Sequence, residues 1–159
     1  MFRFITVLTW EPDLSIDHHE LDAQHQQQVA LVSRIHRGLR DSGSGQALGD
    51  ALADLAQHTE EHFRHEETLM YQCAYPRLDW HRRIHERLLT RLERIRNEMG
   101  RLKDTQRYEL IEDLNLWLVD HIQTADTHFG RFLARQEQRS WSDRVRARYT
   151  LSPSARASK

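Results

Sequence analysis

The sequence predicts an all-α protein, an up-down-up-down antiparallel four-helix bundle with a further short helix near the C-terminus. Three observations predict this fold class. Apolar residues recur at spacings of three and four along four segments of about 20–28 residues, and no stretch alternates as a strand does. Short polar breaks separate the segments, as loops between antiparallel neighbours do. The length of 159 residues and the apolar content of 38% fit one soluble domain with a single core.

The first helix is expected to begin after Asp17, which could cap it because Glu20 follows three residues later. Its apolar stripe runs from Leu21 to Leu39. The Ser-Gly-Ser-Gly run at 42–45 is expected to end this helix, because such clusters mark loops.

The second stripe runs from Leu48 to Cys73, and Pro76 stops that helix or starts the next one. The third stripe, 78–99, is broken at Gly100 and the polar residues that follow. The fourth stripe runs from about 110 to 129. Together the four stripes predict helices that pack near-antiparallel around one axis.

The C-terminal segment is strongly basic. Residues 127–159 carry eight basic and two acidic side chains, a net charge of +6, which leaves about −7 for the rest of the chain. Ser140 or Ser142 could cap a short helix that carries Trp141, Val145 and Tyr149 on one side. We therefore divide the chain into a bundle with an N-terminal arm, 1–133, and a basic extension, 134–159. This extension either docks on the bundle with its basic face in solvent, or binds an acidic partner or an anionic membrane surface.

Composition excludes several classes of protein. The formal charge of −1 argues against a nucleic-acid-binding protein, and no run of 18 apolar residues could span a membrane. The first ten residues lack a small-residue cleavage site, so no secretory signal is expected. Cys73 is the single cysteine and is expected to be a small buried residue. The lack of an intrachain disulfide suits a reducing, cytoplasmic location.

Polar residues occupy seam positions of the predicted bundle where leucine would be expected. They are His25, His62, Glu66, His81, His85 and His121. Burying a carboxylate among apolar stripes costs several kcal/mol unless a cation compensates its charge. The pairs 62/66 and 81/85 project together from one helix face, which suits chelation of a metal ion. Asp126 follows His121 by five residues, about 140° around an ideal helix, so it needs a long reach or a local widening of the helix.

Imidazole and carboxylate ligands without thiolate suit iron, manganese or zinc. The seven donors exceed the needs of one ion. With two octahedral ions, two bridging carboxylates and one bridging hydroxide, one coordination position stays open. An open position on a two-metal centre is a binding site for a small molecule.

These motifs resemble the bacterial hemerythrins. The resemblance covers the chain from Trp10 to Asp126 and rests on the runs DAQH at 22–25, HFRHEETLM at 62–70, HRRIH at 81–85 and WLVDHIQTAD at 117–126. It implies a non-haem, oxo- or hydroxo-bridged centre of two iron ions. In that arrangement one iron is bound by His81, His85 and His121, and the other by His25 and His62, while Glu66 and Asp126 bridge both.

The resemblance also implies the function, which is reversible dioxygen binding at the open iron, as an oxygen carrier, store or supplier rather than an enzyme. Two alternatives stay open. One is a redox enzyme that acts on peroxide or nitric oxide at the same centre. The other is an oxygen or redox sensor whose metal state changes how the basic extension meets a partner. The family's oxygen pocket maps onto Phe63, Trp117, Leu118 and Ile122, which are all apolar.

Gln28 departs from the family, which usually has leucine there. Either Gln28 turns away from the axis and Val29 fills the gap, or its amide points at the bound oxygen species. His58 lies four residues before His62 and is a rival ligand by spacing alone, although the match of Glu66 favours His62. His36 is expected to be an ordinary surface or partly buried residue.

Overall fold

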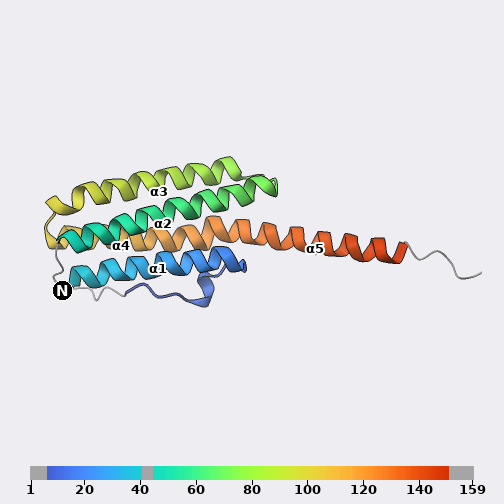
Figure 1. The fold of residues 1–159 in the computed structure, drawn as a ribbon, viewed down its shortest axis with the longest axis horizontal. Coiled ribbons are helices and arrows are strands. Elements are labelled where there is room, and N and C mark those ends of the chain that lie inside the picture. Colours follow the sequence, from blue (N-terminus) through green and yellow to red (C-terminus); the bar gives the residue numbers. More distant parts are fainter. Residues whose placement is uncertain (1–6, 41–44, 151–159) are drawn as a thin grey trace, which may run out of the picture.

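The computed structural model describes residues 7–40 and 45–150, and within these ranges every regular element is helical. The bundle is built from α1 (His19–Arg40), α2 (Gly45–Gln72), α3 (Leu78–Glu98) and α4 (Asp104–His121), which alternate in direction (Figure 1). Helix α1 packs against α2 and α4, and α2 packs against α3. This arrangement confirms the predicted four-helix bundle. None of the described helices is long and apolar enough to cross a membrane.

The fourth helix of the bundle does not end where the sequence suggested. After α4, the chain passes through a five-residue π-helix, η3 (Ile122–Asp126), and continues directly into α5 (Thr127–Thr150). The expected separate helix with a cap at Ser140 or Ser142 is therefore wrong, and Ser142 Oγ donates instead to Gln138 O within the helix, at 2.9 Å. The physical reason is that no glycine or proline follows Gly130 until Pro153, so nothing interrupts the helix.

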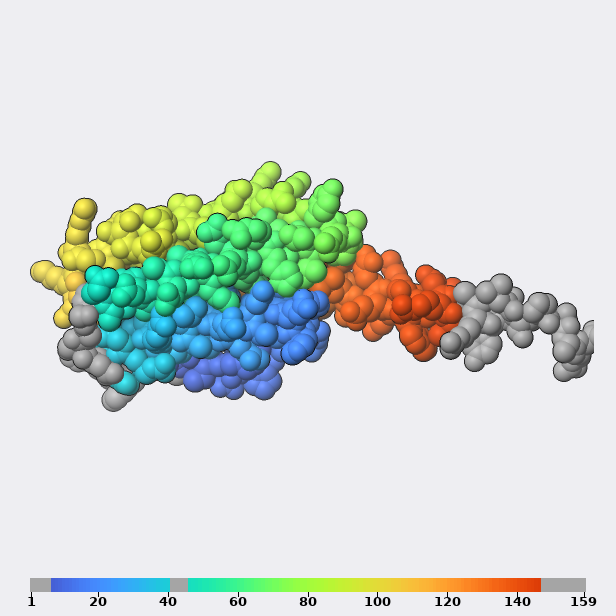
Figure 2. Space-filling model, in the orientation of Figure 1, coloured from blue at the N-terminus to red at the C-terminus, as the bar shows by residue number. Residues whose placement is uncertain are grey.

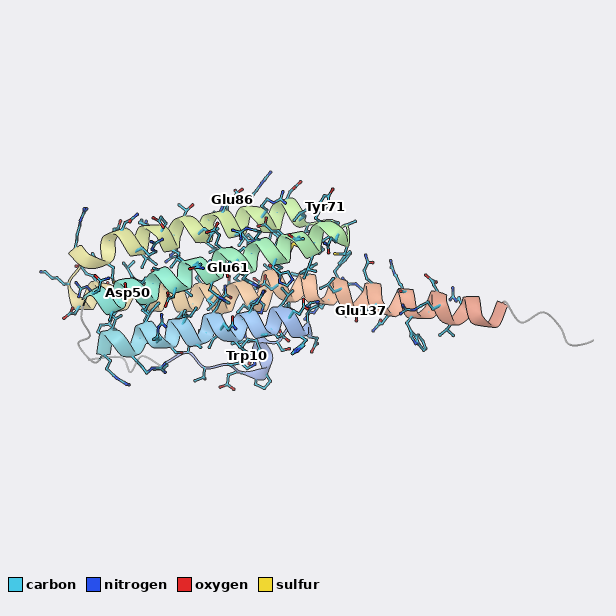
Figure 3. All side chains as sticks on the ribbon, viewed as in Figure 1. Trp10, Asp50, Glu61, Tyr71, Glu86 and Glu137 are labelled. Atoms are coloured by element: carbon cyan, nitrogen blue, oxygen red, sulfur yellow. The ribbon has the colours of Figure 1, made fainter. Side chains whose placement is uncertain are left out.

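The second half of α5 projects beyond the bundle (Figures 1 and 2). Every residue from Ala134 to Trp141 is exposed, and Trp141 is 63% exposed. Figure 3 shows Glu137 on this projecting part, away from the other helices. The described part of the basic extension therefore projects from the bundle, although Gln136 Nε2 near its start donates to Cys73 O at 3.2 Å. Its acidic or membrane partner stays a prediction, and residues 151–159 lie outside the described part of the chain.

The N-terminal arm covers the base of α5. The arm includes a short 3-10 helix, η1 (Pro12–Leu14), and runs along the outside of α1, where Trp10 is labelled in Figure 3. Leu14 and Ile16 are buried in the core. Gln123 Nε2 donates to Asp13 Oδ2 at 3.3 Å, which ties the arm to the π-helix.

The arm also changes how α1 begins. Asp17 is not the cap, because its backbone has a φ of 60°, the left-handed region that Asp tolerates in turns. His18 Nδ1 accepts instead from the Leu21 N–H at 3.4 Å. The Asp22 carboxylate accepts from Ser15 Oγ at 2.6 Å and from Ile16 N at 2.9 Å. These bonds hold the turn between the arm and α1.

A 3-10 turn, η2 (Met99–Arg101), joins α3 to α4. Cys73 follows the end of α2 and is only partly buried, so the expectation of a small buried residue is not met. Its Sγ donates to Met70 O at 3.5 Å.

Candidate metal centre

All seven sequence-predicted ligands are buried in the bundle interior, each at most 3% exposed. They come from all four helices of the bundle and from η3. Helix α1 supplies His25, α2 supplies His62 and Glu66, and α3 supplies His81 and His85, while α4 supplies His121 and η3 supplies Asp126. Some of the residues beside them face solvent, since one residue turns a helix by about 100°. Glu61 and Glu86, labelled in Figure 3, are exposed neighbours of two of these histidines.

The donor atoms form two groups that share one residue. The larger group contains Glu66, His81, His85, His121 and Asp126, and the smaller contains His25, His62 and Asp126. Within each group the donor atoms lie within 4.8 Å of one another. The arrangement can hold two cations, one with five protein donors and one with three.

Asp126 connects the two groups through its two carboxylate oxygens. Oδ1 lies 3.1 Å from Nε2 of both His81 and His121, whereas Oδ2 lies 3.2 Å from His25 Nε2. The π-helix makes this position accessible, because its wider turn brings residues five apart to the same side. Of the two routes left open by the sequence, the structure therefore shows the local widening of the helix.

Many of the inward-facing atoms have no hydrogen-bond partner within the described residues. They include both oxygens of Glu66 and of Asp126 and the Nε2 atoms of His81, His85 and His121. Glu66 Oε2 lies 3.1 Å from His81 Nε2 and 3.2 Å from His85 Nε2. Such a buried set of polar atoms is costly unless it is satisfied, and a bound cation would satisfy it. The residues present therefore fit a metal centre with nitrogen and oxygen ligands, of the kind that iron, manganese or zinc accepts.

Burial and the two carboxylates set the protonation of the histidines. Burial lowers the pKa of His62 to about 3 and that of His121 to about 4, so both are neutral at pH 7 and able to bind metal. Burial also opposes the charged form of His81, but the contacts with Asp126 and Glu66 outweigh it and raise its pKa to about 9. A metal ion between the same carboxylates would take the place of that proton.

Two of the histidines are held from behind by hydrogen bonds. Gln24 Oε1 lies 2.9 Å from His62 Nδ1, and Glu67 Oε1 lies 2.8 Å from His85 Nδ1. When each Nδ1 carries the proton, it donates outward and leaves Nε2 free to face the centre. Arg82 Nε donates to the same Glu67 at 3.0 Å. Sequence reasoning missed both partners, although each is a direct neighbour of a ligand in the chain.

Aromatic and aliphatic side chains enclose the centre. The Phe63 ring stacks on His85 with centroids 3.6 Å apart, and Trp117 stacks on His121 at 5.8 Å. Phe63, Leu118 and Ile122 are buried, while Trp117 is half-buried. Of the four residues assigned to an apolar pocket, Phe63 and Trp117 thus contact ligand histidines, while Leu118 lies on α4 and Ile122 directly follows His121.

Gln28 points into the bundle rather than away from it. It is 1% exposed, and Val29 is buried beside it. Its Nε2 donates to Thr59 Oγ1 on α2 at 3.4 Å, whereas Oε1 has no partner within the described residues. The amide is therefore buried and reaches Thr59 of α2, and its orientation toward a bound oxygen species stays a prediction.

Other histidines stay outside the donor groups. His58 belongs to neither group, and its Nε2 lies 3.1 Å from the Gln24 carbonyl oxygen. His36 is 3% exposed, so its expected place at or near the surface is wrong. Its Nε2 accepts from Asn115 Nδ2 at 2.6 Å, a contact between α1 and α4 that the sequence pattern of one helix could not reveal.

Comparison with known proteins shows which family the chain belongs to. The chain is 27% identical over 153 residues to a bacteriohemerythrin of Stenotrophomonas maltophilia, covering 91% of this chain and 99% of that relative. It is 30% identical over 125 residues to a bacteriohemerythrin of Pseudomonas aeruginosa, covering 77% and 78%. A myohemerythrin of Theromyzon tessulatum is 26% identical over 117 residues, covering 74% and 86%. The model of the hemerythrin HHE cation binding domain matches residues 17–133, so the chain belongs to the hemerythrin family of cation-binding domains.

Proposed function

We propose that this protein binds dioxygen reversibly at a centre of two non-haem iron ions, as an oxygen carrier, store or supplier. The observation that carries the proposal is the unequal division of donors, five in one group and three in the other, with Asp126 in both. An ion held by the five-donor group would have most of its coordination positions filled by the protein. An ion with fewer protein ligands keeps a position for a small molecule. Ferrous iron supplies the electrons for dioxygen binding.

The ligand assignment belongs to the same proposal. His81, His85 and His121 would hold one iron and His25 and His62 the other, with the carboxylates of Asp126 and Glu66 as further ligands. The shared role of Asp126 is supported by its two carboxylate oxygens, because Oδ2 faces His25 of one donor group and Oδ1 faces His121 of the other. For Glu66 the support is that Oε2 faces two histidines while the buried Oε1 has no hydrogen-bond partner among described residues.

The chain's own residues would protect the bound gas from water. Phe63, Leu118 and Ile122 are each at most 4% exposed, which gives the interior no direct path for solvent at these positions. The outward hydrogen bonds of His62 and His85 fix the ring orientation, so that Nε2 need not reorganise when an ion or a gas arrives. A dry and rigid interior suits reversible binding, because stray protons promote irreversible oxidation.

Visible absorption of the reduced, iron-loaded protein tests the proposal. Charge-transfer bands should appear in air and vanish under argon. Direct passage to a stable ferric spectrum, without an oxygenated phase, would contradict reversible carriage.

A matched pair of histidine variants tests the ligand assignment. His121→Ala should lose iron and the bands, whereas His128→Ala should retain both, because His128 is exposed on α5. Equal iron content in the two variants would refute the role of His121.

One observation favours the second candidate function, redox chemistry on peroxide or nitric oxide at the same centre. The buried amide of Gln28 introduces a polar group on the side of the three-donor group. A site built only to hold dioxygen away from protons would not need one. The direct ferric outcome of the absorption experiment would favour this second function.

A further inference from the structure

Gln28 is a buried amide whose hydrogen-bonding capacity is mostly unused. An amide side chain offers two N–H donors and an oxygen that can accept two bonds. Within the described residues Gln28 makes one long bond, from Nε2 to Thr59 Oγ1 at 3.4 Å, and its Oε1 has no partner. The side chain is 1% exposed, so solvent does not compensate for the missing bonds. A polar atom in this state indicates a small polar molecule that is bound there at some stage.

The position of the amide follows from the antiparallel register of α1 and α2. The Nε2 atoms of His25 and His62 lie 3.2 Å apart across these helices. Gln28 follows His25 by three residues, and Thr59 precedes His62 by three. The Gln28–Thr59 contact is therefore the next cross-helix contact, about one helical turn from the two histidines.

These histidines belong to the donor group with three members rather than five. A small ligand that enters the bundle would occupy the positions that this group leaves free. The same group therefore has the fewer protein donors and lies about one helical turn from an amide with an unpartnered oxygen.

We propose that Gln28, positioned by Thr59, forms a hydrogen-bonding subsite beside the three-donor group and selects small anionic or protonated ligands, such as azide and hydroperoxide, over apolar gas molecules. This inference rests on the proposed iron centre. The second N–H of Gln28 donates to an anionic ligand, and Oε1 accepts from a ligand that carries a proton. Thr59 accepts the first N–H and so keeps the amide from turning away.

Azide binding to the ferric, iron-loaded protein tests the subsite. Gln28→Leu should raise the Kd for azide about tenfold, because a hydrogen bond to a charged group is lost. The antisymmetric stretch of bound azide should also shift in the infrared spectrum, since it reports hydrogen bonding to the anion. Gln27→Leu is the matched control, because Gln27 is the adjacent residue of the same type and is exposed. Its Kd and its azide stretch should equal those of the wild type.

Two further variants keep the test decisive if Gln28→Leu loses its iron. Gln28→Met preserves the length of the side chain without its hydrogen bonds, so it should weaken azide binding by a similar factor. Thr59→Val removes the anchor but leaves the amide, so a smaller rise in Kd is expected. A Kd within twofold of wild type in every iron-loaded Gln28 variant would overturn the subsite, as would a wild-type protein that binds no azide.

Failure of the subsite differs from failure of the proposed function. Dioxygen binding is measured on the ferrous protein and azide binding on the ferric protein. Reversible oxygenation with an unchanged azide Kd in Gln28→Leu would reject the subsite alone. A weakened azide Kd without reversible oxygenation would reject oxygen carriage alone.

Discussion

The contact between the arm and α5 predicts that Gly130→Ala destabilises the protein. A Cβ at Gly130 would lie 3.0 Å from the Cβ of Ile16 and 3.3 Å from its carbonyl carbon, and closer still to its carbonyl oxygen. Ile16 cannot retreat easily, because it is buried and its N–H donates to Asp22 at 2.9 Å. Overpacking costs about 1–3 kcal/mol, and a clash with backbone belongs near the upper end. Alanine is favoured over glycine within a helix by about 1 kcal/mol, which offsets part of this cost. The free energy of unfolding should therefore fall by about 2 kcal/mol.

Gly38 and Gly49 supply the matched controls. Both lie within helices, and a Cβ on either would meet nothing within 4 Å. The same change to alanine there should raise the free energy of unfolding by about 0.5–1 kcal/mol, because alanine loses less conformational entropy on folding. One substitution is thus expected to act with opposite signs at different positions of similar secondary structure.

Urea unfolding of the iron-loaded variants, followed by circular dichroism at one metal concentration, measures these differences. Release of the arm should also expose the half-buried Trp10 in Gly130→Ala and shift its fluorescence to longer wavelength. The reasoning would be refuted by a Gly130→Ala protein that gains stability as the two controls do. That result would mean that the arm does not pack closely on α5.

Three further predictions concern the metal centre and one buried histidine. Removal of metal with a chelator should lower the thermal midpoint in calorimetry, because Glu66 and Asp126 are fully buried carboxylates that then lose their cation; an unchanged midpoint would argue against a structural role for the ion. Glu67→Gln should weaken metal retention about 10- to 100-fold in a competition assay, since Glu67 orients His85, whereas Glu86→Gln on the exposed face of α3 should have no effect. Burial lowers the pKa of His36 below its ordinary value. As the pH falls through about 6.5, His36 is therefore protonated in the unfolded chain while it is still neutral in the folded protein. Its contribution to stability is therefore present above about pH 6.5 and is lost as the pH falls below it, and His36→Gln should flatten the change in urea midpoint between pH 7 and pH 5.

Helical phase explains why so much of the centre could be predicted from the sequence. His62 and Glu66, like His81 and His85, occupy positions of helical stripes that are otherwise apolar. Their spacing from the apolar residues is enough to predict that they face the bundle interior. Asp126 is the informative exception. An ideal helix would turn it away from His121, and only a π-helix, one of the two geometries left open, brings it to the centre.

The partners behind the ligands could not be predicted in the same way. Gln24 and Glu67 lie one residue from a ligand and therefore one step out of phase, where polar residues are normally solvated. Their role depends on the neighbouring helix: Gln24 of α1 reaches His62 of α2, and Glu67 of α2 reaches His85 of α3. A periodicity identifies which side of a helix faces inward, but it does not specify which residues of two helices meet.

The end of the bundle shows a similar limit. The stripe of core residues fades after Phe132 and Leu133, which are the last of the described side chains of α5 to pack against the core. Loss of the apolar pattern ends the packing without ending the helix, since backbone hydrogen bonds continue until a residue breaks them. The basic extension therefore continues as a projecting helix rather than folding back as a separate one.

Unpartnered polar atoms in the interior fall into two kinds, and the difference bears on function. The oxygens of Glu66 and Asp126 and the inward nitrogens of the histidines face one another within about 3 Å, so a shared cation satisfies them together. Gln28 Oε1 has no partner among the described residues, and an ion shared by the carboxylates and the histidines would not by itself supply one. A leucine at this position would avoid the free-energy cost of burying an unpartnered amide oxygen. It would also leave an apolar interior, which favours reversible dioxygen binding. A buried amide one turn from His25 is therefore better explained by the ligand it binds than by the fold it stabilises.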